Sequence, residues 1–206
     1  MTRYRMIKEF LKRLDESDIA IFAGKLLCEE AYVNDRVGNF YIPDTHGIVL
    51  SFSLGLAMCT DKRVFVFTTD SEFLRDVGSA TQMAVSECKN LFYFIFSSGA
   101  YIESGKHPNI FKSMSHPQGV LFRMGFVSFV FDSYFRSSER MSELKGVMDT
   151  MVGPVSVLLE VGTKKGNNKP LDQDNLYFLN RFYKFIKDND TAMFEPPPLK
   201  STFKSQ

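Results

Sequence analysis

Short apolar runs alternate along this chain with longer segments in which apolar residues recur every three or four positions. The runs are of strand length and rich in β-branched and aromatic residues: Ile19–Phe22, Phe40–Ile42, Val64–Phe67, Leu91–Phe96, Phe126–Phe131 and Val155–Val161. The periodic segments between and around them predict amphipathic helices, among them 7–14, 26–32, 48–59, 137–150 and 175–187. This alternation predicts an α/β three-layer sandwich with a mainly parallel sheet and right-handed crossovers.

The central stretch, Arg63 to Tyr101, predicts a strand, a helix and a second strand. Polar Thr69-Asp70-Ser71 follows the first strand, and Ser97-Ser98-Gly99 follows the second. Because ligands of parallel sheets bind at the carboxyl ends of the strands, these groups are candidates to hold a metal and a phosphate. The alternative is that Asp70 only caps the helix that follows it.

Two helical segments carry more specific expectations about their faces. The helix after Asp70 is expected to run without a break, with the apolar residues Phe73, Val77, Ala80 and Ala84 along one face. The last helix is expected to point Leu176, Leu179, Phe182 and Phe185 inward.

A further segment, from Gly47 to Cys59, places Ile48, Phe52, Gly55 and Cys59 on one helical face. Its glycines and other small residues indicate close backbone packing.

Length and composition describe an ordinary globular chain. With 206 residues, 44% of them hydrophobic, we expect one domain over 1–190, followed by an extended or disordered tail over 191–206 that contains Pro196-Pro197-Pro198. A net charge of +1 gives no reason to expect nucleic acid or an anionic membrane as a partner. No apolar run reaches transmembrane length, and the first residues are too charged for a signal peptide.

Cysteine usage and motif searches narrow the chemistry further. Cys28, Cys59 and Cys88 are too few and too widely spaced for a disulfide framework or a zinc site, which favours a cytoplasmic protein. Neither GxGxxG after a strand nor GxxxxGK[ST] is present, so the dinucleotide and Walker nucleotide sites lack their main signal.

Taken in order, the segments from Ile7 to Phe185 resemble the diphosphate-binding domain of thiamine-diphosphate-dependent enzymes, most of all that of phosphonopyruvate and sulfopyruvate decarboxylases. Thr69-Asp70-Ser71 stands where that family has Gly-Asp-Gly, and Ser97-Ser98 stands where it has Asp-Asn. The turn Asp44–Ile48 resembles the family's Gly-Ser-Met-Gly turn, and the loop Gly99–Gly105 resembles its loop over the diphosphate. The resemblance therefore implies the thiamine-diphosphate-binding fold.

The resemblance also implies site residues. Mg²⁺ would be held by the side chains of Asp70 and Ser98 and by the carbonyl oxygen of Ala100, since Mg²⁺ prefers oxygen ligands. Residues placed near the cofactor by the same matching are Gly24, Lys25, His46, Gly47, Thr69, Ser71, Gly99 and Tyr101. A glutamate that activates the cofactor would come from a partner, so no catalytic residue is assigned in this chain.

Several positions depart from the family pattern. Both glycines beside Asp70 are replaced, a serine occupies the asparagine position at Ser98, and His46 stands where methionine is usual. A serine hydroxyl reaches less far than an amide oxygen, although a water molecule could bridge the gap. Glu72 is either a compensating ligand or a first-turn charge that favours the helix dipole.

The resemblance implies a function that needs a second polypeptide. These enzymes bind thiamine diphosphate between two domains, and this chain has the length of one. The first hypothesis is the diphosphate-binding subunit of a heteromeric, Mg²⁺-dependent 2-oxo-acid decarboxylase, a carboxy-lyase, that pairs with a pyrimidine-binding subunit and acts on a small acidic 2-oxo acid. The alternative is a non-catalytic relative that serves as a scaffold or regulatory subunit. A third candidate is an α/β enzyme that binds another phosphorylated ligand at the same edge.

Overall fold

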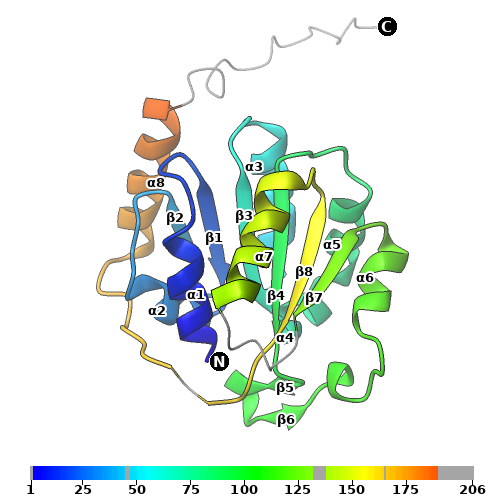
Figure 1. The fold of residues 1–206 in the computed structure, drawn as a ribbon. Helices are drawn as coiled ribbons and strands as arrows, with labels where there is room; N and C mark the ends of the chain where they lie inside the picture. Colours follow the sequence, from blue (N-terminus) through cyan, green and yellow to red (C-terminus); the bar gives the residue numbers. More distant parts are fainter. Residues whose placement is uncertain (1, 45–46, 132–137, 165, 190–206) are drawn as a thin grey trace, which may run out of the picture.

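The computed structural model describes residues 2–44, 47–131, 138–164 and 166–189, which form a parallel sheet covered by helices (Figure 1). The sheet strands are β1 (Ile19–Ala23), β2 (Asn39–Ile42), β3 (Val64–Thr69), β4 (Leu91–Ser97), β7 (Val127–Phe131) and β8 (Val155–Glu160). The α-helices are α1 (Arg3–Leu11), α2 (Lys25–Tyr32), α3 (Val49–Met58), α4 (Asp70–Arg75), α5 (Val77–Ala84), α6 (Gln118–Met124), α7 (Ser138–Thr150) and α8 (Asn175–Asn189). A short hairpin of β5 (Ala100–Tyr101) and β6 (His107–Pro108) and the 3₁₀ helices η1 (Ile102–Ser104) and η2 (Ile110–Lys112) follow β4.

The sheet has the strand order β2-β1-β3-β4-β8-β7, and every neighbouring pair is parallel. The connection from β1 to β2 runs toward one edge of the sheet, whereas the connection from β3 to β4 runs toward the other. The direction in which successive strands are added to the sheet therefore reverses between β1 and β3, although all the strands stay parallel. In open parallel sheets the crevice at such a reversal, beyond the carboxyl ends of the strands, is where ligands bind.

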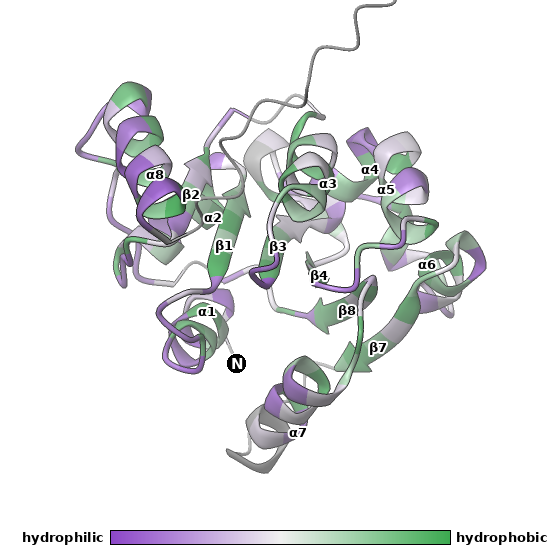
Figure 2. Ribbon diagram, turned by 90° about the horizontal axis from the view of Figure 1, so that it is seen from above, coloured by the Kyte–Doolittle hydropathy of each residue, from purple (hydrophilic) through white to green (hydrophobic). Residues whose placement is uncertain are grey.

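The sheet lies between two layers of helices, as seen from above in Figure 2. One hydrophobic cluster joins the sheet to α1, α2 and α7, and the other joins it to α3, α4, α5 and α6. Helix α8 covers the β2 edge and contributes Phe178 to the first cluster and Phe182, Phe185 and Ile186 to the second. The predicted three-layer α/β sandwich is confirmed.

The central strands are apolar on both faces because both faces are buried. Phenylalanine rings stack across neighbouring strands, with centroids 5.0 Å apart for Phe65 and Phe92 and 5.2 Å apart for Phe67 and Phe94. Phe10 of α1 meets this layer edge-on, 4.5 Å from the Phe94 centroid. Burying each ring contributes about 1.5–3 kcal/mol, so this aromatic layer is a rigid support for the strand tips.

The expectation of one unbroken helix after Asp70 is wrong. Asp76 has φ −133° and ψ 39°, outside the helical region, and separates α4 from α5. Its backbone N–H bonds to the carbonyl of Phe73, which closes the last turn of α4. The periodic apolar spacing continues across this break, so hydrophobic pattern alone could not reveal it.

The expectation for the last helix is half wrong. Phe182 and Phe185 are buried as predicted, but Leu176 and Leu179 are exposed. The buried stripe runs through Phe178, Phe182, Phe185 and Ile186, because the larger phenylalanine rings bury more apolar area than the two leucines do. The tail expected over 191–206 lies outside the described residues. Among the described helices, none has the length and apolar character to cross a bilayer.

Two glycines offer a matched test of this packing. A Cβ on Gly38 would lie 2.5 Å from the carbonyl oxygen of Asp18, whereas a Cβ on Gly146 of α7 would meet no heavy atom within 4 Å. We expect Gly38→Ala to lower the free energy of unfolding by about 1–3 kcal/mol, because backbone must move to admit the methyl group. Gly146→Ala should leave it unchanged or raise it by up to about 1 kcal/mol.

Urea denaturation followed by circular dichroism measures both changes. An equal effect of the two substitutions would contradict the close approach at Gly38.

Candidate functional site

Three chain segments meet at the carboxyl edge of the sheet, at the reversal between β1 and β3. They are the turn at Gly24 after β1, the segment Thr69–Ser71 where β3 passes into α4, and the segment Ser97–Ala100 after β4. Gly24 has φ +94°, a conformation that favours glycine, and it begins α2. The parallel register pairs Thr69 with Phe96, so the residues that follow β3 and β4 emerge side by side.

The carboxylate of Asp70 is buried, with 1% exposure, and binds the backbone that follows β4. Its Oδ2 accepts hydrogen bonds from the backbone N–H of Ser98 at 2.9 Å, from the N–H of Gly99 at 2.7 Å and from Ser97 Oγ at 3.2 Å. Gly99 adopts φ +67°, which turns its N–H toward the carboxylate. Thr69, not Asp70, caps α4: its side chain accepts a hydrogen bond from the N–H of Glu72 at 3.3 Å. Asp70 is therefore not the helix cap that the alternative assumed; it fixes the loop after β4.

Below the site, a second buried polar contact joins the same two strands. The hydroxyls of Thr68 and Tyr93 lie 2.9 Å apart. Burial raises the pKa of Tyr93 far above its usual value, so its hydroxyl stays protonated.

The oxygen atoms assigned to a metal lie close together. The carbonyl oxygen of Ala100 accepts hydrogen bonds from Ser71 Oγ at 3.3 Å and from Ser98 Oγ at 3.2 Å. Ser71 Oγ also lies 3.4 Å from Asp70 Oδ1, the carboxylate oxygen that does not hold the loop. These bonds are long for hydroxyl donors, so turning the hydroxyls toward another partner sacrifices little energy.

This donor set suits a hard cation. Carboxylate, hydroxyl and carbonyl oxygens are ligands that Mg²⁺ accepts, and the ion usually keeps several waters and shares phosphate oxygens. The set contains a single carboxylate, Asp70. Within the described part of the chain, no group of three or more histidine, cysteine, aspartate or glutamate side chains could hold a metal. A cation at this place would therefore complete its coordination with waters or with oxygen atoms of a bound ligand.

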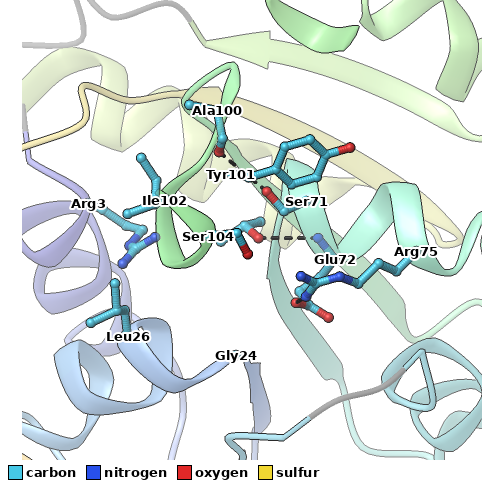
Figure 3. A pocket seen from close by; sticks show the side chains of 11 residues that line it. Arg3, Gly24, Leu26, Ser71, Glu72, Arg75, Ala100, Tyr101, Ile102 and Ser104 are labelled. Carbon is cyan, nitrogen blue, oxygen red and sulfur yellow. Dashed lines mark hydrogen bonds and ion pairs between the residues drawn. The ribbon is translucent and has the colours of Figure 1, made fainter. Parts of the chain in front are cut away.

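A shallow pocket, open to solvent on one side, lies beyond the carboxyl ends of β1 and β3 (Figure 3). It is lined by residues of α1, of the turn before α2, of α4 and of the hairpin after β4: Arg3, Gly24, Leu26, Thr69, Ser71, Glu72, Arg75, Ala100, Tyr101, Ile102 and Ser104. In Figure 3 the side chain of Ser71 and the carbonyl of Ala100 point toward each other at one wall.

Two ion pairs set the charge of this pocket. Glu72, 8% exposed, pairs with Arg75 one turn later on α4, and Arg3 pairs with Glu30 of α2 at 2.7 Å. Both arginines are therefore neutralised by a carboxylate. A phosphorylated ligand would have to draw Arg75 or Arg3 away from its partner, or bring a cation with it.

The sequence-predicted site residues divide into four groups. Gly24, Thr69, Ser71, Ala100 and Tyr101 line the pocket, and Asp70 and Ser98 meet behind its wall. Lys25, Gly47 and Gly99 do not line it. His46 lies outside the described residues.

Gly47 nevertheless lies close to the pocket. Its φ is +77°, and a Cβ there would lie 3.6 Å from the carbonyl oxygen of Arg75, which lines the pocket.

Sequence reasoning missed Arg3, Leu26 and Arg75. Ile102 and Ser104 belong to the loop Gly99–Gly105 that the resemblance placed over the diphosphate, although neither residue was named singly. Arg75 is marked by its position in the last turn of α4, where a cation favours the helix dipole, but nothing local marks Arg3. Arg3 reaches the pocket only because α1 packs beside α2, a contact between distant parts of the chain.

Comparison with known proteins begins with sequence. No protein-family model matches the chain. It is 30% identical over 104 residues to sulfopyruvate decarboxylase subunit beta of Methanocaldococcus jannaschii, a match that covers 50% of this chain and 55% of that protein. It is 35% identical over 106 residues to sulfopyruvate decarboxylase of Methanosarcina acetivorans, covering 51% of this chain and 27% of the relative. The subunit beta of Methanococcus maripaludis is 27% identical over 105 residues and is covered to 57%. The chain thus spans about half the length of the beta subunits it matches.

Solved structures extend the comparison to most of the chain. Benzoylformate decarboxylase of Polynucleobacter necessarius superposes with a TM-score of 0.63 over 83% of this chain and 34% of its own, at 11% identity. A Mycobacterium smegmatis protein assigned to the thiamin-diphosphate-dependent enzymes gives a TM-score of 0.57 over 79% and 31%, at 14% identity. The fold is that of thiamine-diphosphate-dependent enzymes. The 2-oxoglutarate:ferredoxin oxidoreductase of Magnetococcus marinus shares the same fold, with a TM-score of 0.61 over 90% of this chain and 66% of its own, at 13% identity.

Substitutions at Asp70 and Ser98 test whether the Asp70 carboxylate holds the loop after β4. Asp70→Ala leaves the buried N–H of Gly99 and the N–H of Ser98 without an acceptor, so we expect the free energy of unfolding to fall by about 2–4 kcal/mol. Ser98→Ala removes one long hydrogen bond to a carbonyl and should lower it by less than about 1 kcal/mol.

Urea denaturation of the two variants measures the difference. Equal stabilities of Asp70→Ala and the parent chain would show that the carboxylate does not hold the loop.

Proposed function

We propose that this chain is the diphosphate-binding subunit of a heteromeric 2-oxo-acid decarboxylase that depends on thiamine diphosphate and Mg²⁺. Similarity to sulfopyruvate decarboxylase beta subunits supports a small acidic 2-oxo acid, such as sulfopyruvate or phosphonopyruvate, as the substrate class. The shared fold with thiamine-diphosphate-dependent enzymes supports the cofactor. On this proposal, residues 1–190 form one diphosphate-binding domain.

One observation carries the proposal. Oxygen atoms of Asp70, which follows β3, lie close to those of Ser98 and Ala100, which follow β4, at the carboxyl edge of the sheet. That edge is where an open parallel sheet binds a phosphorylated ligand. The convergence occurs in a chain whose relatives are named for the corresponding chemistry.

The residues present would divide between Mg²⁺, the diphosphate and the aminopyrimidine ring of the cofactor. Asp70 Oδ1, Ser98 Oγ and the Ala100 carbonyl would face Mg²⁺, while Oδ2 of Asp70 keeps the loop in place. Ser71 and the turn at Gly24 would face the diphosphate with a hydroxyl and backbone donors. Gly47 and His46 would lie by the aminopyrimidine ring, with Thr69, Lys25, Gly99 and Tyr101 completing the surroundings.

When bound, thiamine diphosphate supplies the carbanion stabilisation that decarboxylation of a 2-oxo acid requires. The part of this chain is to bind and orient the cofactor and to keep its diphosphate end away from bulk water. Arg75 would reach a phosphate oxygen by releasing Glu72, and the Mg²⁺ that comes with the diphosphate would offset the added negative charge.

A complete enzyme would need a second polypeptide. The activating glutamate of the resemblance is not matched to any residue of this chain, and the pocket is open on one side. The match covers only 27% of the Methanosarcina acetivorans decarboxylase, so that protein holds much additional chain of its own. A separate pyrimidine-binding subunit would play that part here.

A second candidate, a non-catalytic subunit with the same fold, is favoured by the charge in the pocket. Glu72 lines the pocket, so its carboxylate would lie near a bound diphosphate and repel it. The backbone N–H of Glu72 already donates a hydrogen bond to the side chain of Thr69 and would not be available to a phosphate. Arg3 and Arg75 are both paired.

Calorimetric titration of thiamine diphosphate in the presence of Mg²⁺ decides between the two candidates. We expect the chain together with its partner subunit to bind the cofactor. Ser98→Ala should weaken binding about threefold to tenfold, because the hydroxyl is one of few oxygen donors. Ser98→Asn should tighten it, since an amide oxygen reaches further than a hydroxyl.

Ser115→Asn, on the exposed stretch before α6, is the matched control and should leave the affinity unchanged. Lack of binding by the parent complex and by Ser98→Asn alike would favour the non-catalytic subunit.

A further inference from the structure

Helix α8 has more apolar surface than the rest of the chain covers. It runs along the β2 edge of the sheet, as Figure 1 shows, and buries four large apolar side chains against the two hydrophobic clusters: Phe178, Phe182, Phe185 and Ile186. The two leucines that the sequence predicts to point inward lie instead on its exposed side. Packing within one chain therefore leaves part of the apolar side of α8 in contact with solvent.

Three large side chains form this uncovered part, which we call the α8 stripe: Leu176, Leu179 and Tyr183. They are 61%, 51% and 50% exposed, and spacings of three and four residues place them in line along the helix. Ile186, the next residue at this spacing, is buried, so the stripe borders directly on the buried side. Asn180, which is polar but uncharged, flanks it. Alternating spacings of three and four are those of the apolar seam between two packed helices.

Aromatic rings continue the α8 stripe onto the body of the protein. Phe182, one turn after Leu179, has its ring centroid 4.7 Å from that of Phe40 on β2. Phe40 in turn stacks on Phe52 of α3 at 5.3 Å, and Phe52 is itself exposed. Single exposed apolar residues are normal, but a contiguous apolar surface marks a site of interaction.

Opposite charges lie at the two ends of the α8 stripe. Asp172 and Asp174 precede the helix, and Asp174 Oδ1 accepts a hydrogen bond of 2.7 Å from the N–H of Tyr177. Lys184 and Lys187 lie near its carboxyl end, and among the described residues they pair with no carboxylate. Lys187 follows Tyr183 by four residues and so continues the line of the stripe. The stripe thus runs from an acidic end through an apolar middle to a basic end.

This order of charges matches a second copy of the same helix that runs in the opposite direction. A twofold axis beside Leu179, between positions 179 and 180, places Leu176 of each copy opposite Tyr183 of the other. The same axis places Lys187 opposite Asp172, because the two residues are equally far from it along the chain. Antiparallel helices also bring each amino end beside a carboxyl end, which the helix dipoles favour.

Other arrangements match the stripe less well. Parallel pairing of two copies would place Lys187 against Lys187 and Asp172 against Asp172. An anionic membrane would meet cations at one end only and carboxylates at the other. Asp172 already pairs with Lys169 at 2.8 Å, and its exposed carboxylate can accept a second lysine from outside.

We propose that α8 is a homodimerisation helix: two copies of this chain pack their α8 stripes antiparallel about a twofold axis, with Lys187 of each copy facing Asp172 of the other. The inference does not depend on the proposed function, since α8 contributes no residue to the lining of the candidate pocket. Neither a cofactor nor a different polypeptide is needed for this contact.

Sedimentation velocity of the purified full chain at a series of concentrations tests the dimer. We expect the parent chain to show a reversible equilibrium between monomer and dimer. Leu179→Lys places a charge beside the axis and should raise the dissociation constant about tenfold or more. Val152→Lys, on a residue of similar exposure just before β8, is the matched control and should leave it unchanged. Both side chains are exposed, so the circular dichroism spectrum and melting temperature should stay those of the parent.

An exchange of charges tests the antiparallel register. Lys187→Asp and Asp172→Lys should each weaken self-association about threefold or more, because like charges then meet twice in every dimer. Mixed in equal amounts, the two variants should associate as tightly as the parent, because both contacts of the mixed dimer join opposite charges.

Three results would overturn the inference. They are a parent chain that stays monomeric at about 100 µM, a Leu179→Lys chain that dimerises as tightly as the parent, and a mixture of the two charge variants that associates no better than either alone.

Discussion

The site depends on a buried carboxylate that ties two neighbouring strands together at their tips. Asp70 follows β3, and its Oδ2 receives two backbone N–H groups from the loop after β4. A buried carboxylate is tolerated only when it is well hydrogen-bonded, and here the donors are main-chain groups held by the parallel register. The loop that carries Ser98 and the Ala100 carbonyl is thereby fixed relative to α4. Every oxygen at the candidate cation site takes its place from this contact.

This arrangement means that Asp70 serves structure and chemistry at once. One carboxylate oxygen is used within the protein, and the other faces the hydroxyl of Ser71 at 3.4 Å. Loss of cofactor binding on removing Asp70 would therefore combine two effects, a disordered loop and a lost ligand. Substitutions at Ser98, whose own hydrogen bond is long, separate them.

The sequence predicted the architecture well because its signals are local. Apolar runs such as Val64–Phe67 and Leu91–Phe96 are strands in the structure, and the polar residues after them meet at one edge because parallel strands end together. Features that depend on tertiary contacts were not predictable. The helix breaks at Asp76, although the periodic apolar pattern continues across that residue. In α8, Leu176 and Leu179 are exposed because the larger phenylalanine rings form its buried side. Arg3 lines the pocket only through packing of α1 against α2. The ion pair between Glu72 and Arg75 in the pocket was not predictable either, because opposite charges three residues apart are also common on solvent-exposed helices.

Helix α1 contributes to both the hydrophobic core and the wall of the candidate pocket. Phe10, at its carboxyl-terminal end, is wedged edge-on against the phenylalanine layer of the sheet, while Arg3, at its start, forms part of the pocket wall and neutralises Glu30. Shortening the protein to begin at its first strand would thus uncover the aromatic layer and open one wall of the ligand site in a single cut. The amino-terminal helix is an integral piece of both, although it lies far from Asp70 along the chain.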